Sequence, residues 1–248
     1  MLPNNKKFGL IGKDISYSFS KKYFTEKFSQ DQYENYNYEN FDIPNIEEFP
    51  NILKNNPNLK GLNVTIPYKE AIIPFLDTVS DKAYKIGAVN IIRVTKNGNL
   101  KGYNSDWYGF KKSLKPLLKP HHQKALILGQ GGAAKAVAFA LKKLNIEFKF
   151  VTRKENKSSI IYNQLDASAF INYQIVINCT PLGTSPNTEE FPQIPYNYFT
   201  DKHIAFDLIY NPKETQFLSK AKEFGATIIN GEEMLIFQAE KAWNIWNK

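Results

Sequence analysis

Short apolar runs alternate along the chain with longer stretches in which apolar side chains recur every three or four positions. The runs predict strands at residues 8–11, 59–65, 124–128, 148–152, 175–178 and 204–208. The periodic stretches predict helices at residues 18–28, 69–76, 107–118, 133–144, 215–224 and 232–246. A strand pair is expected within 88–103, turning at Asn97-Gly98-Asn99. This alternation is typical of βαβ units around a largely parallel sheet.

The pattern indicates an α/β protein with two domains. We expect a first α/β domain over residues 1–106 and a doubly wound domain over residues 107–230. The last helical stretch presents a broad apolar face that includes Trp243 and Trp246. Since such a face is too large to leave in water, residues 231–248 are expected to return to the first domain and complete it.

Composition excludes several classes of protein. With 248 residues, of which 42% are hydrophobic, the chain has enough apolar material for a folded core and is not a disordered protein. No leader-like or membrane-spanning apolar segment is visible, so we expect a cytoplasmic protein that does not contact membranes. Cys179 is the only cysteine, and the three histidines lack ligand-like spacing, so no metal site is expected.

The charge balance favours an anionic ligand. Lys and Arg total 32 against 24 for Asp and Glu, a net charge of +8. No basic run with interleaved aromatic residues is present, so we do not expect nucleic acid as a partner. The pattern leaves open whether the protein is a monomer or a homodimer.

A glycine cluster stands between the strand predicted at 124–128 and the helix predicted at 133–144. Its residues are Gly129, Gln130, Gly131, Gly132, Ala133 and Ala134, which fit G-x-G-x-x-A. Gly129 permits a tight turn, Gly131 lets a pyrophosphate approach the backbone, and Ala134 permits close helix packing. The helix N-terminus offers N–H donors to the anion, so the context predicts a dinucleotide site rather than a simple turn.

The end of the following strand indicates which dinucleotide binds. An NAD-selective site usually carries Asp or Glu there, whereas this chain has Thr152-Arg153-Lys154. A guanidinium is a planar, multi-donor partner for a phosphate. Arg153, helped by Thr152, Lys154 or Lys157, therefore predicts NADP.

Polar segments at 18–20, 63–69, 87–90 and 104–106 stand at the ends of the predicted strands of the first domain. Each alone has an ordinary explanation as a cap, a turn or a solvated charge. Further ordered motifs are the glycine loop, Asn178-Cys179-Thr180-Pro181-Leu182-Gly183, Asp207-x-x-Tyr210-x-Pro212-x-x-Thr215 and Gly231-x-x-Met234-Leu235-x-x-Gln238. Together these segments resemble the shikimate dehydrogenase family along nearly the whole chain.

The resemblance implies a substrate domain, a Rossmann-type NADP domain, and reversible NADPH-dependent reduction of 3-dehydroshikimate to shikimate in aromatic amino-acid (chorismate) biosynthesis. It implies that Lys69 and Asp106 are catalytic. It implies that the substrate contacts are Ser18, Ser20, Thr65, Asn90, Tyr210 and Gln238. It implies that the cofactor contacts are residues 129–133 with Thr152, Arg153, Lys154, Asn178, Thr180, Leu208, Gly231 and Met234.

Two alternatives stay open. One is a quinate/shikimate dehydrogenase that uses NAD or NADP, against which Arg153 argues. The other is a non-catalytic nucleotide-sensing or nucleic-acid-binding protein, against which the presence of Lys69 and Asp106 argues. Whether Lys69 or Asp106 transfers the proton also stays open, because a coupled pair titrates jointly.

Overall fold

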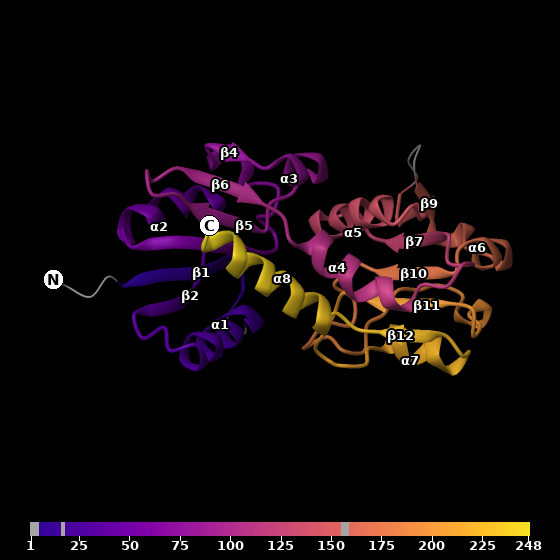
Figure 1. The fold of residues 1–248 in the computed structure, drawn as a ribbon. Helices are drawn as coiled ribbons and strands as arrows, with labels where there is room; N and C mark the ends of the chain where they lie inside the picture. The colour runs from indigo at the N-terminus through magenta and orange to yellow at the C-terminus, as the bar shows by residue number, and fades with distance from the viewer. Residues whose placement is uncertain (1–4, 16–17, 155–158) are drawn as a thin grey trace. The chain divides into compact units, whose positions relative to one another are not determined.

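The computed structural model describes residues 5–15, 18–154 and 159–248. They fall into two compact units (Figure 1). Unit 1 extends to Ser105 and includes Ala239–Lys248, and unit 2 is Asp106–Gln238. The long C-terminal helix therefore contributes its first half to unit 2 and its second half to unit 1.

Unit 1 is built on a mixed sheet with the strand order β2-β1-β3-β5-β6-β4. Its strands are β1 (Lys6–Gly12), β2 (Tyr36–Asp42), β3 (Leu59–Val64), β4 (Thr78–Val79), β5 (Ile91–Val94) and β6 (Leu100–Tyr103). β1 runs parallel to β2 and β3, whereas β5 is antiparallel to both β3 and β6. The carboxyl ends of β1, β3 and β6 and the amino end of β5 therefore lie at one edge of the sheet.

Helices cover both faces of the unit 1 sheet. They are α1 (Phe19–Gln30), α2 (Phe49–Asn55), α3 (Asp81–Ile86) and the second half of α8 (Glu232–Trp246). Phe8 on β1 packs with Phe24 of α1 and Trp243 of α8 in one buried cluster. Ile11, on the opposite face of β1, packs with Phe49 of α2 in another. Because successive side chains of a strand point to opposite faces, β1 contributes residues to the hydrophobic cores on both sides of the sheet.

Trp246 is the main anchor of α8 in unit 1. Its indole Nε1 donates to the carbonyl of Ile92 at 3.0 Å, and its ring lies 5.0 Å from that of Phe8 and 5.1 Å from that of Phe24. The ring also lies directly over Gly61 of β3, where a Cβ atom would collide with the indole. The close approach of helix to sheet therefore requires glycine at position 61.

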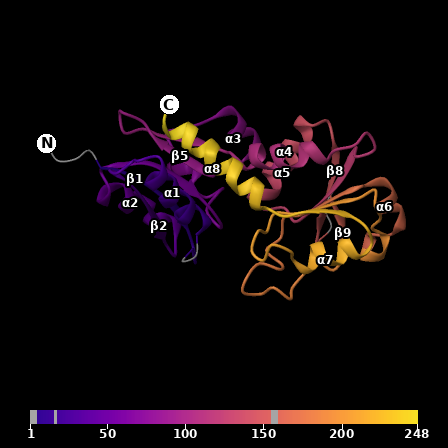
Figure 2. The ribbon, with the colours of Figure 1, turned by 60° about the horizontal axis from the view of Figure 1, so that its bottom comes forward.

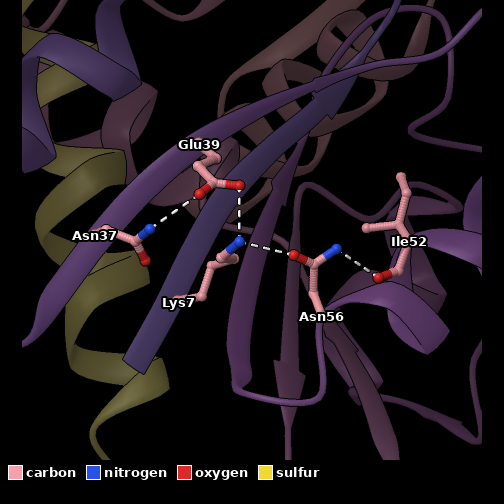
Figure 3. Close-up of polar contacts among 5 residues, drawn as sticks. All are labelled: Lys7, Asn37, Glu39, Ile52 and Asn56. Atoms are coloured by element: carbon pink, nitrogen blue, oxygen red, sulfur yellow. Dashed lines mark hydrogen bonds and ion pairs between the residues drawn. The ribbon is translucent and has the colours of Figure 1, made fainter. Parts of the chain in front are cut away.

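A polar cluster connects β1, β2 and the end of α2 near the amino ends of β1 and β3 (Figure 3). The ammonium of Lys7 on β1 donates to Glu39 Oε2 of β2 at 2.9 Å and to Asn56 Oδ1 at 2.8 Å. Asn56 in turn donates to the carbonyl of Ile52 in α2 at 2.8 Å, and Asn37 donates to Glu39 at 2.9 Å. Because Lys7 is only 17% exposed, these bonds are partly shielded from water.

Unit 2 has an all-parallel sheet with the order β12-β11-β10-β7-β8-β9. Its strands are β7 (Lys124–Leu128), β8 (Glu147–Thr152), β9 (Ser159–Ile161), β10 (Ile175–Asn178), β11 (Ile204–Asp207) and β12 (Thr227–Ile229). Numbered within the unit and read from the β9 edge, the order is 3-2-1-4-5-6, which is the Rossmann arrangement. The predicted α/β fold class is confirmed.

The helices of unit 2 are α4 (Asp106–Leu114), α5 (Gly132–Lys143), α6 (Ala167–Asn172) and α7 (Gln216–Glu223). Leu126 of β7 packs with Phe170 of α6 and Phe217 of α7 in one cluster. Phe206 of β11 instead lies 4.8 Å from Phe110 of α4, and α4 lies beside α5 (Figure 2). Helices thus cover both faces, as a doubly wound sheet requires.

Two predicted helices differ from the structure. The helix expected at 69–76 is wrong: the segment forms turns and a short 3-10 helix at Ile73–Phe75. Pro74 lacks the N–H that an α-helix over this range would use to bond the carbonyl of Glu70. The helix expected at 107–118 ends at Leu114, and Pro116 lies in the 3-10 helix that follows. The predicted strand pair within 88–103 is confirmed as β5 and β6, and Gly98 takes the left-handed φ of +81° in their turn.

Of the helices in the ranges described above, none combines the length and apolar character needed to cross a membrane.

Two buried histidines of unit 2 form hydrogen bonds with backbone groups. His122 Nδ1 accepts from the N–H of Lys119 at 2.9 Å, so its Nε2 carries the proton shared with the Lys202 carbonyl at 3.0 Å. His203 Nδ1 accepts from the N–H of Thr200, and its Nε2 pairs with the Phe170 carbonyl. Burial lowers the pKa of both side chains from 6.5.

We expect the contribution of His122 and His203 to the free energy of unfolding to fall as the pH drops below about 6.5, because the unfolded chain then binds protons that both side chains resist in the folded state. Buried Asp207 acts in the opposite direction near pH 6, because its pKa is raised to about 6, so the histidine contribution is measured as the difference between each variant and the wild type. Thermal unfolding from about pH 7.5 to about pH 5.5 measures this slope. His122→Gln and His203→Gln should each flatten it relative to the wild type, and His121→Gln, at an exposed position, is the control. Slopes in both variants as steep as that of the wild type would contradict this expectation.

Candidate active site

Residues singled out in the first domain reach one edge of the unit 1 sheet. Thr65 directly follows β3, Asn90 directly precedes β5, and Ser105 lies just beyond β6. Ser18 caps α1, which follows β1, and its hydroxyl accepts from the N–H of Lys21 at 3.2 Å. The strand directions established above bring these segments together, although they are far apart in the sequence.

The turn that enters α4 is held by Asn90. Its side-chain amide donates to Ser105 Oγ at 3.1 Å, and its Oδ1 accepts from the N–H of Ser105 at 2.7 Å. The side chain of Asn104 donates to the carbonyl of Ala88 at 3.0 Å. Asp106, the first residue of α4, is 2% exposed. The backbone leading to this buried carboxyl group is therefore fixed by two side-chain amides.

Tyr38 and Asn63 form hydrogen bonds with the predicted substrate residues Ser20 and Asn90. The Tyr38 hydroxyl donates to Asn63 Oδ1 at 2.7 Å, and the Asn63 amide donates to the Asn90 carbonyl at 3.4 Å. Ser20 hydrogen-bonds the Tyr38 hydroxyl, whose pKa is raised by burial. Tyr38 thus connects Ser20 to Asn90 through Asn63, a role that the sequence analysis missed because β2 was not predicted.

Lys69 lies half-buried in the turns after β3. Its carbonyl accepts from the N–H of Val89 at 2.7 Å. The neighbouring Tyr68 donates its hydroxyl to the Ile43 carbonyl at 2.6 Å and its N–H to the Thr65 carbonyl at 2.9 Å. The turn that carries Lys69 is therefore tied to two other segments of unit 1, at Val89 and at Ile43.

In unit 2 the glycine loop connects β7 to α5. Gly129 has a φ of +102°, which favours glycine, and its N–H donates to the Val151 carbonyl at 3.0 Å. A Cβ on Gly129 would lie 3.4 Å from Thr180 Cγ2, whereas a Cβ on Gly131 would meet open space. Gly131 caps α5 without a side-chain hydrogen bond, so N–H groups of the first turn of α5 are available to an anion. This cradle fits the pyrophosphate of a dinucleotide.

The strand order of unit 2 reverses between β7 and β10, and this position is the switch point of the sheet. The glycine loop follows β7, and the turn after β10 follows its neighbour, so both lie at the switch point. Asn178 is fully buried at the end of β10. Its Oδ1 accepts both the N–H of Thr180 at 3.0 Å and the Thr180 hydroxyl at 2.6 Å. One side-chain amide thus sets the conformation of the turn that adjoins the glycine loop.

Asp207, at the end of β11, is fully buried. Its carboxylate accepts from Asn178 Nδ2 at 3.1 Å, the N–H of Ile209 at 3.0 Å and the Thr215 hydroxyl at 2.6 Å. Burial raises its pKa to about 6, and the three hydrogen bonds act in the opposite direction. The sequence analysis quoted Asp207 in a motif but assigned it no role.

Two cations follow β8, at the predicted site of the cofactor's extra phosphate. Arg153 and Lys154 are exposed, and Thr152 donates its hydroxyl to the Lys154 carbonyl at 2.7 Å. Thr152 Oγ1 also lies 2.9 Å from Ser159 Oγ, which ties the turn to β9. The described residues at this strand end, Thr152, Arg153 and Lys154, include no carboxylate. Lys157 lies outside the described residues.

Two glycines bring backbones into close contact near the start of α8. A Cβ on Gly109 of α4 would lie 2.5 Å from the carbonyl oxygen of Met234, and a Cβ on Gly231 would collide with the Leu208 carbonyl. The N–H of Gly231 donates to the Ile209 carbonyl at 2.9 Å. These contacts position Leu208, Gly231 and Met234, the predicted cofactor residues of this region.

The predicted site residues thus fall into a group in each unit. The unit 1 group comprises Ser18, Ser20, Thr65, Lys69 and Asn90. The unit 2 group comprises Asp106, residues 129–133, Thr152, Arg153, Lys154, Asn178, Thr180, Leu208, Tyr210, Gly231, Met234 and Gln238. Tyr210 and Gln238 are half-buried, in the turns after β11 and on α8. Among the residues described, no cluster of three or more His, Cys, Asp or Glu side chains could hold a metal ion.

Comparisons with known proteins show which family the chain resembles in sequence and in structure. A profile described as the shikimate dehydrogenase substrate binding domain matches residues 10–92. A relative from Clostridium botulinum named shikimate dehydrogenase (NADP(+)) is 40% identical over 248 residues, covering 96% of this chain and 95% of the relative. Shikimate dehydrogenase from Aquifex aeolicus is similar in structure, with a TM-score of 0.87 and 34% identity, covering 100% of this chain and 94% of that one. Shikimate 5-dehydrogenase from Thermus thermophilus, solved with NADP(H) and shikimate, has a TM-score of 0.83 and 31% identity, covering 97% and 93%.

Proposed function

Because the chain belongs to the shikimate dehydrogenase family, we infer that it catalyses the reversible NADPH-dependent reduction of 3-dehydroshikimate to shikimate. This reaction is a step of aromatic amino-acid (chorismate) biosynthesis, and the protein is an oxidoreductase acting on CH–OH groups. The observation that carries this inference is the 40% identity to an NADP-dependent relative over 96% of the chain. We assign most of the substrate contacts to residues 1–106 with 231–248 and most of the NADP contacts to residues 107–230. The exceptions are Tyr210, a proposed substrate contact, and Gly231 and Met234, which are proposed cofactor contacts.

Lys69 and Asp106 are the proposed catalytic pair. When bound, NADPH supplies the hydride that reduces the carbonyl carbon. Negative charge then develops on the substrate oxygen, and the Lys69 ammonium stabilises that charge and donates the proton. The carboxylate of Asp106 would hold the ammonium in position. Lys69 suits this role because its backbone is fixed by the bond from Val89 described above.

Substrate recognition would come from hydroxyl and amide side chains. We propose that these bind the carboxylate and hydroxyls of the substrate: Ser18, Ser20, Thr65, Asn90, Tyr210 and Gln238. Support comes from the chain of hydrogen bonds from Ser20 through Tyr38 and Asn63 to the backbone of Asn90, and from the bonds of the Asn90 side chain to Ser105, all of which form before any ligand arrives. Preorganisation of this kind lowers the entropy lost on binding.

Cofactor binding would use the switch point of unit 2. We propose that residues 129–133 hold the pyrophosphate and that Thr152, Arg153 and Lys154 hold the 2′-phosphate. The remaining proposed contacts are Asn178, Thr180, Leu208, Gly231 and Met234. The uncapped start of α5, the open space over Gly131 and the exposed cations after β8 support this assignment.

Loss of NADPH absorbance with 3-dehydroshikimate tests the function directly. We expect turnover that is faster with NADPH than with NADH, and reverse turnover with shikimate that exceeds turnover with quinate. A preference for quinate or NADH would instead assign the chain to the alternative activity within the same fold. If none of these pairs were turned over, the proposed enzymatic function would be wrong.

Replacing Lys69 with Ala should lower kcat by about 10²–10⁴-fold, the range expected for loss of a general acid, while substrate binding changes much less. Steady-state kinetics at saturating NADPH would measure both. Lys85→Ala, at an exposed position on α3, is the matched control and should match the wild type. A kcat in Lys69→Ala equal to that of the wild type would exclude this catalytic assignment.

Arg153→Ala should raise the KM for NADPH by about tenfold, because a charge-assisted bond to the 2′-phosphate is lost at an exposed site. The KM for NADH, which lacks that phosphate, should not change. Lys149→Ala, at an exposed position on the neighbouring β8, controls for the loss of a surface cation. Equal changes with both cofactors would show that Arg153 does not read the phosphate.

A further inference from the structure

We propose that Asp207 is a positioning residue for the cofactor: its buried carboxylate fixes the two loops that leave β10 and β11, and thereby sets the affinity for NADPH. It accepts hydrogen bonds from both loops, through Asn178 Nδ2 and the N–H of Ile209. A third bond, from the Thr215 hydroxyl at 2.6 Å, reaches the N-cap of α7. One side chain therefore joins three segments of unit 2.

A carboxylate suits this surrounding. All three partners donate to it, and they approach both oxygens: Asn178 and Ile209 at Oδ1, and Thr215 at Oδ2. An amide at position 207 would turn its N–H₂ group either toward the donors Asn178 and Ile209 or toward Thr215, whose hydroxyl would then have to accept instead of donate. Either arrangement replaces the charge-assisted bonds of the carboxylate with weaker ones. The ionisable neighbours that feel its charge, Cys179 and Tyr196, have pKa values raised by burial and by Asp207, so both are neutral. The negative charge at this point is thus stabilised by three hydrogen bonds.

The position of Asp207 is transmitted to the proposed cofactor contacts by short steps. Asn178, which donates to Asp207, holds Thr180 through its Oδ1. The carbonyl of Asn178 also accepts from the N–H of Leu208 at 3.1 Å. Leu208 in turn lies against the backbone of Gly231. A change at Asp207 therefore moves Thr180, Leu208 and Gly231 together.

This inference rests on the proposed function, because the affected residues are the proposed NADPH contacts. Asp207 itself is fully buried and acts through Asn178 and Ile209. Its loss should weaken NADPH binding without removing a group that acts on the substrate oxygen. The expected signature is a rise in KM and Kd for NADPH with a much smaller change in kcat at saturation.

The test measures the Kd of NADPH by its fluorescence, and KM and kcat by turnover, for Asp207→Asn in the full chain. We expect Kd and KM for NADPH to rise about tenfold or more, with kcat at saturation within about threefold of the wild type. Asp201→Asn, at an exposed position in the turn before β11, should match the wild type. Unchanged NADPH affinity in folded Asp207→Asn, or a fall in kcat as large as the rise in KM, would overturn the proposal.

Thr215 provides a second pair of variants in case Asp207→Asn does not fold. Thr215→Val keeps the side-chain shape and removes the donor to Asp207, so KM for NADPH should rise about threefold. Thr215→Ser keeps the hydroxyl and should restore wild-type affinity. Equal affinities in folded Thr215→Val and Thr215→Ser would overturn the proposal. An inactive wild type that still binds NADPH would instead count against the proposed function, and the Kd comparison would still stand.

Discussion

The common direction of the strands in unit 2 is the constraint on which its site depends. Because β7, β10 and β11 are parallel, the loops that follow them leave the sheet at the same edge. Polar groups at these strand ends are cut off from water, since Asn178 and Asp207 are fully buried, and each must find a partner inside the protein. Their mutual hydrogen bond meets that requirement and holds the loops in place.

Unit 1 meets the same requirement with different chemistry. There the buried groups are neutral, and Asn90 is the centre of the network. Its side chain bonds to Ser105, and its carbonyl accepts from the Asn63 amide. Unit 2 uses a carboxylate as its centre, which accepts three bonds at once. A neutral centre avoids the cost of burying charge, whereas the charged centre forms stronger bonds.

Elements with strong periodicity could be predicted from the sequence, and those with weak periodicity could not. The bounds of β7, β10 and α8 match the prediction because their apolar patterns are unbroken. Strand β2 was missed because its sequence, YNYENFD, is polar at most positions, as suits the edge of a sheet. Helix α3 was also missed, although Ser80 before it and left-handed Gly87 after it are ordinary start and stop signals.

The site was predictable to the extent that its residues stand in ordered motifs. Motif order identified Lys69, Asn90 and the glycine loop as candidates, and the structure adds how each is held. The roles of Tyr38 and Asp207 could not be predicted, because their partners come from segments distant in the sequence. Asp207, for example, meets Asn178 only because β10 and β11 pair in register. A hydrogen-bond network of this kind is a property of the folded chain and leaves no local pattern.

The contact between Gly61 and Trp246 has a consequence for how such sequences change over time. A side chain at position 61 and the indole at position 246 compete for the same space, since even a Cβ atom on Gly61 would collide with the ring. A larger residue at 61 is therefore tolerated only after the ring has been exchanged for a smaller one. Loss of the ring alone leaves a void in the aromatic cluster around Phe8 and Phe24. Substitutions at these two positions, on β3 and at the end of α8, are thus coupled, and the effect of exchanging one depends on which residue stands at the other.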